Sequence, residues 1–491
     1  MMQESVLSEK VARGGIWLFS LRFLSRGLGF ARTIILARLL MPADFGLVGI
    51  SLLAISTLDF LSQTGFQPAL IQKKVCSRSH TDTAWTLLII RGLVLFLILF
   101  LSAPMISKFF NMPAVELLIK VIAISVALSG FRNIGIIFFQ KEMQFEKHFK
   151  YEISGSFIDL IISIFLAFLL RNVWAIVWGG LAGNITRLGM SYWLSDYRPR
   201  IAMEWSKLKE LFSFGKWVLG TGIIYSLLVQ VDSFSIGKIL GPAELGFYQM
   251  AILIAFLPSS EISYVVSQIT FPAYAAIQDD PQRLKSAYLD VLRFTSLISI
   301  PLGVLIFIVA PEFTVLFLGK KWLPIIICMQ ILVFSGTAIS IASTSMPIFS
   351  ARGKPKYETY LQACNLIILI ILVYPLTKFY GIYGTSIALF TAHLTLTCLS
   401  LYMVAKLIDC RRITLVKILI FPLGNAIFMG IIIFVLKKVT ADYAGPFQFI
   451  LLISAALISY GTLIILMDKI MDYGMIPLMK EKWNMIIRIK I

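Results

Sequence analysis

Charged residues are scarce in this chain. Lys, Arg, Asp and Glu together make up 14% of its 491 residues, whereas hydrophobic residues make up 58%. So much apolar surface exceeds what a single globular core can bury, which excludes an ordinary soluble domain. Apolar runs of 18 to 25 residues recur along the chain, and each is long enough for a helix to cross a hydrocarbon layer of ~30 Å. The sequence therefore predicts an all-α integral membrane protein.

The chain also contains few cysteines and histidines, and its loops are short. The five cysteines form no C-x-x-C pair and are odd in number, so neither a disulfide framework nor a zinc site is indicated. The three histidines, His80, His148 and His393, lie far apart. We therefore expect no catalytic residues, no metal site and no cofactor. The longest loop has about twenty residues, which leaves little room for the catalytic segment of a membrane polymerase or glycosyltransferase.

Apolar runs that are separated by charged residues, proline or glycine predict about fourteen transmembrane spans. They lie near 14–39, 46–67, 83–102, 115–139, 153–170, 174–194, 213–240, 246–269, 286–310, 323–349, 360–377, 381–405, 417–436 and 447–467. The N-terminal MMQESVLSEKVARGG lacks the apolar core of a secretory signal. We therefore expect the first span to be retained.

Basic residues are distributed unevenly between alternate loops. The formal charge is +18, but these residues sit in short loops rather than on a solvated face, so no nucleic-acid partner is expected. With the N-terminus in the cytoplasm, 26 of the 44 Lys and Arg fall in cytoplasmic loops and termini, against seven on the opposite side. Because cytoplasmic loops retain an excess of Lys and Arg, both termini are predicted to be cytoplasmic.

The chain also contains an internal repeat. Residues 15–51 align without gaps with residues 215–251, so that Pro42 and Gly46 recur as Pro242 and Gly246. Six spans separate the copies, so both halves enter the membrane from the same side. The repeat predicts two pseudo-symmetric six-helix bundles, 1–205 and 206–406, followed at 407–491 by two additional transmembrane helices and a cytoplasmic tail. The cleft between the bundles is the expected substrate site.

Three arginines lie inside the first apolar run: Arg22, Arg26 and Arg32. Each should oppose insertion by roughly 2.5–3.5 kcal/mol at the bilayer centre. At 100° per residue they fall within an arc of about 120°. This face is expected to line a wet cavity, where the arginines, together with Arg91 of the third span, would bind an anionic substrate.

Acidic residues also occur within the spans, namely Asp59, Asp159, Asp232 and Glu261. They are candidates for a gate or for proton or Na⁺ coupling, and equally for counter-ions of cavity arginines. Asp232 occupies the repeat position equivalent to Arg32. The two could therefore face each other as a gate.

Several segments resemble a known family. ARGGIWLFS at 12–20, ILARLLMPADFGLVGI at 35–50 and DFLSQTGFQPALIQKK at 59–74 resemble the Wzx-type polysaccharide and O-antigen flippases of the multidrug/oligosaccharidyl-lipid/polysaccharide superfamily. SRGLGFAR at 25–32 is similar to the first-helix motif of the lipid II flippases, whose cavity arginines are thought to hold the substrate diphosphate. This similarity implies that role for Arg26 and Arg32.

The resemblance implies a flippase, not an enzyme, in the bacterial inner membrane. Its substrate would be an undecaprenyl-diphosphate-linked oligosaccharide, moved by alternating access to the outer leaflet for O-antigen, capsule or exopolysaccharide synthesis. Besides the lipid bilayer, a polysaccharide polymerase and a chain-length regulator are candidate partners. The alternative is an ion-coupled drug/cation antiporter of the same superfamily, which would need a net acidic cavity, and a membrane polymerase or glycosyltransferase is a more distant alternative.

Overall fold

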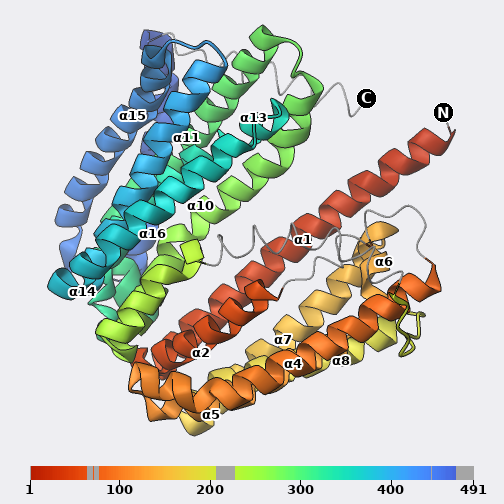
Figure 1. The fold of residues 1–491 in the computed structure, drawn as a ribbon. Helices are drawn as coiled ribbons and strands as arrows, with labels where there is room; N and C mark the ends of the chain where they lie inside the picture. The colour runs from red at the N-terminus through yellow and green to blue at the C-terminus, as the bar shows by residue number, and fades with distance from the viewer. Residues whose placement is uncertain (1, 63–69, 71–76, 206–226, 444, 472–491) are drawn as a thin grey trace. The chain divides into compact units, whose positions relative to one another are not determined.

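The computed structural model describes residues 2–62, 70, 77–205, 227–443 and 445–471. The chain forms two compact units, Met1–Gln249 and Met250–Ile491, and the division falls inside one helix. In the described residues the regular structure is helical (Figure 1). The first unit contains α1 Met2–Leu39, α2 Pro42–Leu61, α4 Arg78–Phe110, α5 Pro113–Gly130, α6 Ile136–Lys141, α7 Phe145–Leu170, α8 Trp174–Leu194, a helix at 227–239 and the start of α10 Pro242–Ala276.

The second unit holds the rest of α10 and the helices that follow it. These are α11 Pro281–Phe313, α12 Ile325–Ser343, α13 Met346–Ala351, α14 Lys356–Leu407, α15 Arg412–Val439 and α16 Pro446–Met471. A π-helical turn at Thr314–Leu318 and 3₁₀ turns at Lys320–Trp322 and Ala441–Tyr443 connect some of them. The repeat-based boundaries at 205 and 406 remain predictions, because the compact units are a different kind of division.

The predicted spans coincide with these helices, with three differences. Span 115–139 is split into α5 and α6, and span 323–349 into α12 and α13, where Pro347 lies in the first turn of the second helix. Proline is tolerated in a first turn because the N–H that it lacks would have no helical partner. Spans 360–377 and 381–405 form the single kinked element α14. Residues 63–67 and 213–226 of two further predicted spans lie outside the described residues.

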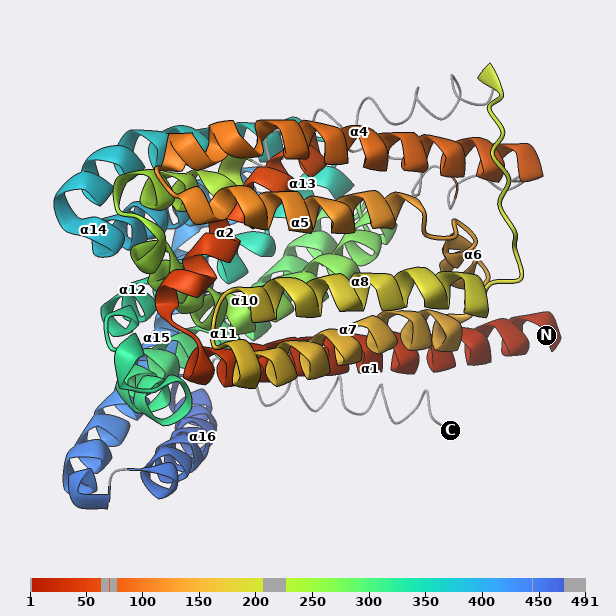
Figure 2. The ribbon, with the colours of Figure 1, turned by 90° about the horizontal axis from the view of Figure 1, so that it is seen from below.

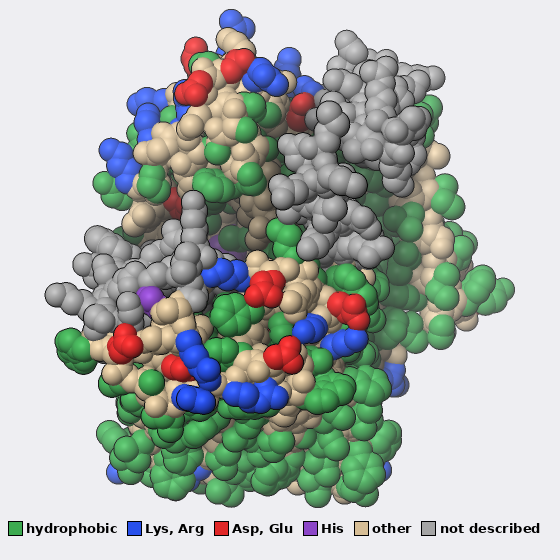
Figure 3. Space-filling view, turned by 90° about the vertical axis from the view of Figure 1, so that its right-hand side faces the viewer, with side chains coloured by type: hydrophobic (Ala, Val, Ile, Leu, Met, Phe, Trp, Pro, Cys, Tyr) green, Lys and Arg blue, Asp and Glu red, His purple; other side chains and the backbone are tan. Residues whose placement is uncertain are grey.

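Ten helices in the described part are long and apolar enough to cross a membrane. Their outer faces carry many exposed large hydrophobic side chains, including Leu101, Met105 and Leu169. Figure 3 shows hydrophobic side chains forming a continuous area beside a band in which Lys, Arg, Asp and Glu gather. A soluble monomer rarely exposes so much contiguous apolar surface. The protein is therefore a multi-pass membrane protein, as predicted.

Small residues bring the helices of the first unit close together. In Figure 2, α4, α5, α8 and α7 run side by side, and adjacent members of this series pack on one another. A Cβ on Gly179 of α8 would lie 1.8 Å from Ser163 Oγ of α7, and one on Gly183 would lie 2.8 Å from the Gly155 carbonyl oxygen. Glycine spaced by four residues allows such close backbone approach between membrane helices.

The repeat is visible at the start of α2 and of α10. Each helix begins with proline, Pro42 or Pro242, a favoured first residue because its missing N–H would have no helical partner. A Cβ on Gly46 would lie 1.7 Å from the Pro242 carbonyl oxygen, and one on Gly246 would lie 1.9 Å from the Pro42 carbonyl oxygen. The repeated residues therefore contact each other reciprocally within the first unit. Gly215 and Trp217, which also match the first copy, lie outside the described residues.

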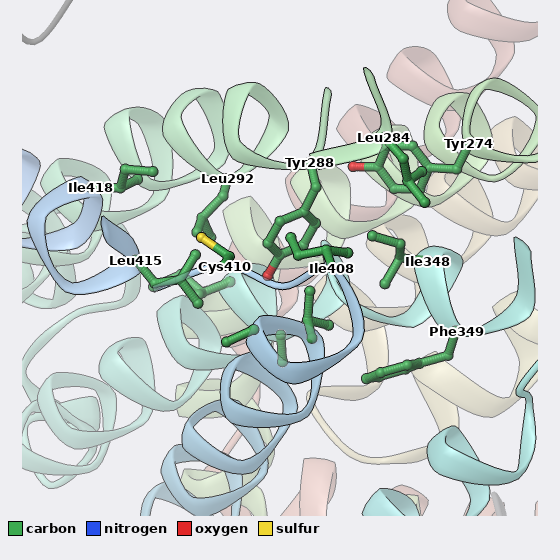
Figure 4. Close-up of a cluster of buried hydrophobic side chains, with 14 of the residues drawn as sticks. Tyr274, Leu284, Tyr288, Leu292, Ile348, Phe349, Ile408, Cys410, Leu415 and Ile418 are labelled. Carbon is green, nitrogen blue, oxygen red and sulfur yellow. The ribbon is translucent and has the colours of Figure 1, made fainter. Parts of the chain in front are cut away.

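The second unit has an apolar core at one end of its helices. Tyr274, Tyr288, Phe349, Ile408 and Cys410 belong to it, from α10, α11, α13 and the segment after α14 (Figure 4). The Tyr288 hydroxyl lies 3.1 Å from Ser345 Oγ, so its polar atom is satisfied. Cys410 is a free thiol in this core.

Gly381 produces the kink in α14. Its backbone has φ 62° and ψ −145°, a region that is essentially restricted to glycine. A Cβ would meet nothing within 4 Å, so the requirement for glycine is conformational rather than steric. The kink separates the two predicted spans of this element.

Replacing Gly381 with alanine is expected to lower the free energy of unfolding by roughly 1–3 kcal/mol, because alanine must adopt a strained backbone. Gly461→Ala is the matched control, since Gly461 is helical and also has open space around its Cα. That change should stabilise the helix by about 0.5–1 kcal/mol. Thermal unfolding in detergent measures both, and equal shifts of Tm for the two variants would contradict the assignment.

Candidate functional site

The three arginines of α1 differ in their surroundings. Arg26 is exposed and Arg22 is half-buried on the helix surface. Arg32 turns toward α7 and α8: its Nη2 lies 3.1 Å from Asp159 Oδ1, and its Nε donates to Ser163 Oγ at 3.0 Å. Arg32, one of the three arginines of the predicted cationic face, is therefore neutralised within the first unit.

Arg91 of α4 also has a carboxylate partner. Its Nη2 donates to Asp59 Oδ1 of α2 at 2.5 Å, and its Nε donates to the Ser62 carbonyl oxygen at 2.9 Å. The Arg91 side chain is 22% exposed, whereas the Asp59 side chain is 49% exposed. Asp59 and Asp159 were each candidates for ion coupling or for counter-ions of arginine. In this structure each is paired with an arginine.

α7 repeats the same arrangement one heptad earlier. Glu152 lies 3.4 Å from Arg187 Nε of α8, and Arg187 Nη2 donates to Ser156 Oγ at 3.0 Å. Acid and serine are thus spaced by four residues in both pairs, Glu152 with Ser156 and Asp159 with Ser163. One face of α7 thereby holds arginines from two other helices, α8 and α1.

Asp232 and Arg32 do not contact each other, so the predicted gate is not formed in this structure. Asp232 is buried and accepts hydrogen bonds from Tyr248 Oη at 2.7 Å and from the Ser233 N–H at 2.6 Å. Arg32 is paired instead with Asp159 of α7. Glu261 lies partly buried on α10, in the second unit.

A cavity of about 580 Å³ lies within the first unit. Its walls come from α2, α5, α8, the 227–239 helix and the start of α10. The polar lining comprises three amides, Asn184, Gln230 and Gln249, four serines, and the carboxylate of Asp59. Among the described residues that line it there is no Lys, Arg or aromatic side chain. The rest of the lining is apolar and includes Leu52, Leu53 and Ile122. The cavity therefore carries uncharged polar groups on a largely apolar wall.

The sequence interpretation followed charges and so missed the three amides. Asn184, Gln230 and Gln249 each interrupt an apolar helix, and a polar side chain in that setting is costly unless a polar partner or water satisfies it. An amide inside an apolar run was therefore a signal from which a polar site could have been predicted. In the described part of the chain, no group of three His, Cys, Asp or Glu could hold a metal ion.

The fold is similar to those of solved transporters. The lipid II flippase MurJ in its inward closed conformation has a TM-score of 0.76 at 16% identity, covering 92% of this chain and 99% of that chain. An inward-facing multidrug resistance MATE family transporter of the MOP superfamily has a TM-score of 0.62 at 17% identity, covering 78% and 94%. At these identities the likeness shows the fold, which is that of the MOP superfamily, as predicted.

Curated relatives carry names from polysaccharide biosynthesis and transport. The lipopolysaccharide biosynthesis protein WzxC of Escherichia coli (strain K12) is 26% identical over 361 residues, 71% of each chain. The succinoglycan biosynthesis transport protein ExoT of Rhizobium meliloti (strain 1021) is 23% identical over 354 residues, 72% of each chain. A putative O-antigen transporter of Shigella flexneri is 22% identical over 276 residues, 54% of this chain and 61% of that protein.

The transport names of these relatives agree with the prediction of a transporter rather than an enzyme. They also agree with the resemblance to polysaccharide exporters found in the first seventy residues. The family model described as "Polysaccharide biosynthesis protein" matches residues 35–327, which is more than half of the chain. The chain therefore belongs to the polysaccharide biosynthesis protein family.

Proposed function

We propose that this protein flips an undecaprenyl-diphosphate-linked oligosaccharide from the cytoplasmic to the outer leaflet of a bacterial inner membrane. Family membership and the transport names of ExoT and the Shigella protein support a saccharide cargo. Two pseudo-symmetric six-helix bundles would alternate access to the site, and the excess of Lys and Arg in alternate loops supports cytoplasmic termini.

The observation that carries the proposal is the position of Arg26. It lies on the exposed surface of α1, inside an apolar run. Facing lipid, this guanidinium would cost roughly 2.5–3.5 kcal/mol on an insertion scale. A water-filled path that binds an anion removes this cost, and a diphosphate accepts the paired hydrogen bonds that guanidinium donates.

Within this proposal the four candidate arginines have different tasks. Arg22 and Arg26 contact the diphosphate. Arg32 and Arg91 are held by Asp159 and Asp59 and take part when those pairs open. The first unit does not favour a cation antiporter. Among the described residues that line its cavity, the one carboxylate is that of Asp59, and it is paired with Arg91.

Arg26→Gln is expected to reduce transport of a labelled lipid-linked oligosaccharide into vesicles by at least about tenfold, since a hydrogen bond to a charged group is worth roughly 1.5–3 kcal/mol. Arg26→Lys should retain part of the activity, because it keeps the charge but loses the paired geometry. Arg283→Gln is the control, as Arg283 is exposed at the start of α11. Wild-type transport by Arg26→Gln, at equal protein insertion, would refute the role of Arg26.

A further inference from the structure

We infer that the cavity of the first unit binds sugar rings of the lipid-linked saccharide, while the arginines of α1 hold its diphosphate. This inference rests on the proposed function and adds a separate subsite to it. The subsite is defined by the amides of Asn184, Gln230 and Gln249 and by the serines that line the same cavity. The ligand that we infer for this subsite is therefore uncharged and rich in hydroxyl groups.

The charge of the lining favours sugar over the other ligands of such transporters. A diphosphate site needs cationic donors, and the described lining contains no Lys or Arg. A cation site needs an available carboxylate, but Asp59 is paired with Arg91. Amides and hydroxyls both donate and accept hydrogen bonds. Sugar hydroxyls do the same, so the lining complements them in chemistry.

Several of these polar side chains have donor or acceptor atoms that are not used within the described part of the protein. Among the described residues, the side chains of Gln249 and Ser125 make no hydrogen bond. Asn184 accepts from Arg132 Nη2 through its Oδ1 at 2.6 Å, which fixes the amide and leaves its NH₂ group as a donor. Polar groups inside a membrane protein are costly when unsatisfied. A wet cavity that receives a polyol satisfies them.

The amides are also held in place by their neighbours. Gln230 Oε1 accepts hydrogen bonds from Ser56 Oγ at 3.0 Å and Thr57 Oγ1 at 2.9 Å. A Cβ on Gly49 would lie 2.3 Å from Gln249 Nε2 and 2.4 Å from its Oε1, so glycine at 49 makes room for that amide. Ordering the donors before binding reduces the entropy lost when a ligand binds.

Gln249 also marks a break in the repeat. Positions 49 and 249 are equivalent, yet one is glycine and the other is glutamine. The pair lies one helical turn beyond the reciprocal contact of Gly46 with Pro242, where Pro42, Ala43 and Gly46 recur as Pro242, Ala243 and Gly246. A structural repeat alone does not require an amide at one of the two positions. Its place in the cavity lining gives a reason for the asymmetry.

The size of the cavity fits a few sugar rings. Its volume is about 580 Å³, within the range of about 300–1,000 Å³ that is typical of small-molecule sites. Every lining residue belongs to the first unit. The subsite therefore exists within one compact part of the protein.

Equilibrium binding to the full-length protein in lipid nanodiscs tests the inference. The probes are undecaprenyl diphosphate and the same lipid carrying one glucose, galactose or N-acetylglucosamine. We expect the wild type to bind at least one sugar-bearing lipid about tenfold more tightly than the bare carrier, as one or two net hydrogen bonds would give. Gln249→Leu should remove most of this gain and leave the affinity for the bare carrier unchanged.

Three further variants complete the design. Ser125→Ala deletes one hydroxyl with little risk to folding and should reduce the gain about threefold, while Gln282→Leu, at an exposed position, should leave it intact. Arg26→Gln should weaken binding of all four lipids alike. If no sugar increases the affinity, or if Gln249→Leu and Ser125→Ala both leave the gain unchanged, the inference is wrong and the flippase proposal stands. If the wild type binds none of the lipids, the proposed function fails as well.

Discussion

Alanine at Gly46 or at Gly246 is expected to reduce both the Tm and the yield of folded protein sharply. The new Cβ would lie 1.7 Å or 1.9 Å from the carbonyl oxygen of the opposing proline. Those oxygens belong to the backbone of a first helical turn, so no rotamer change relieves the overlap. The two helix starts must separate, and overpacking of this kind costs about 1–3 kcal/mol or more.

The contact is reciprocal, which gives the prediction a second part. Once one alanine has separated the two turns, the second alanine meets less resistance. The double variant should therefore lose much less than the sum of the two single losses, as expected for residues that share one contact. Additive losses would show that the two glycines act independently and would contradict the reciprocal contact.

Gly27→Ala and Gly180→Ala are the matched controls. Both residues lie within helices, and a Cβ at either position meets nothing within 4 Å. These changes should leave the Tm unchanged or raise it, because alanine favours the helix by about 0.5–1 kcal/mol. Thermal unfolding in detergent compares all the variants, and a Gly46→Ala protein as stable as Gly27→Ala would rule out the close approach.

Asp159→Asn is the second change with a large expected effect. It leaves the Arg32 guanidinium between α1, α7 and α8 with neutral partners only, Ser163 Oγ and the Ile176 carbonyl oxygen. Breaking a buried ion pair costs about 3–5 kcal/mol. Because the Arg32 and Asp159 side chains are 20% and 22% exposed, we expect about 2–3 kcal/mol here, after allowing for partial screening.

The double variant Arg32→Gln/Asp159→Asn separates a structural from a substrate role. Removing both charges should recover most of the stability lost in Asp159→Asn, since no unpaired charge remains. Transport per folded molecule should stay low in the double variant if Arg32 reaches the diphosphate when the pair opens. Asp59→Asn is a graded comparison, with a smaller expected loss because the Asp59 side chain is 49% exposed. A stability loss in Asp159→Asn that is no larger than in Asp59→Asn would argue against the pairing.

The sequence predicted the helices well because their signals are local. Length, apolar composition and punctuation by proline and glycine lie within each span, and they placed α8 at Trp174–Leu194, the range expected. The prediction was less accurate where a turn interrupts an apolar run, as between α5 and α6. There Asn133 bonds the backbone N–H of Gly135 at 2.9 Å, a side-chain interaction that hydropathy does not register.

The candidate site was only partly accessible from the sequence. The arginines of α1 were evident, because charge in an apolar run is conspicuous. The cavity amides were overlooked because the interpretation followed charged residues, and a neutral side chain such as Gln249 adds no charge. Its part in a cavity depends on Gly49 making room for it, and that requires the packing of two helices.

By itself, the sequence determined that this chain is a helical, multi-pass membrane protein with an internal repeat and arginines in its first span. These properties follow from composition, period and self-similarity. The tertiary structure alone decided which arginines are neutralised, because ion-pair partners come from distant segments: Arg32 bonds Ser163, which lies 131 residues further along the chain. The charge of a side chain follows from its residue type, but its ion-pair partner depends on which segments of the chain pack around it.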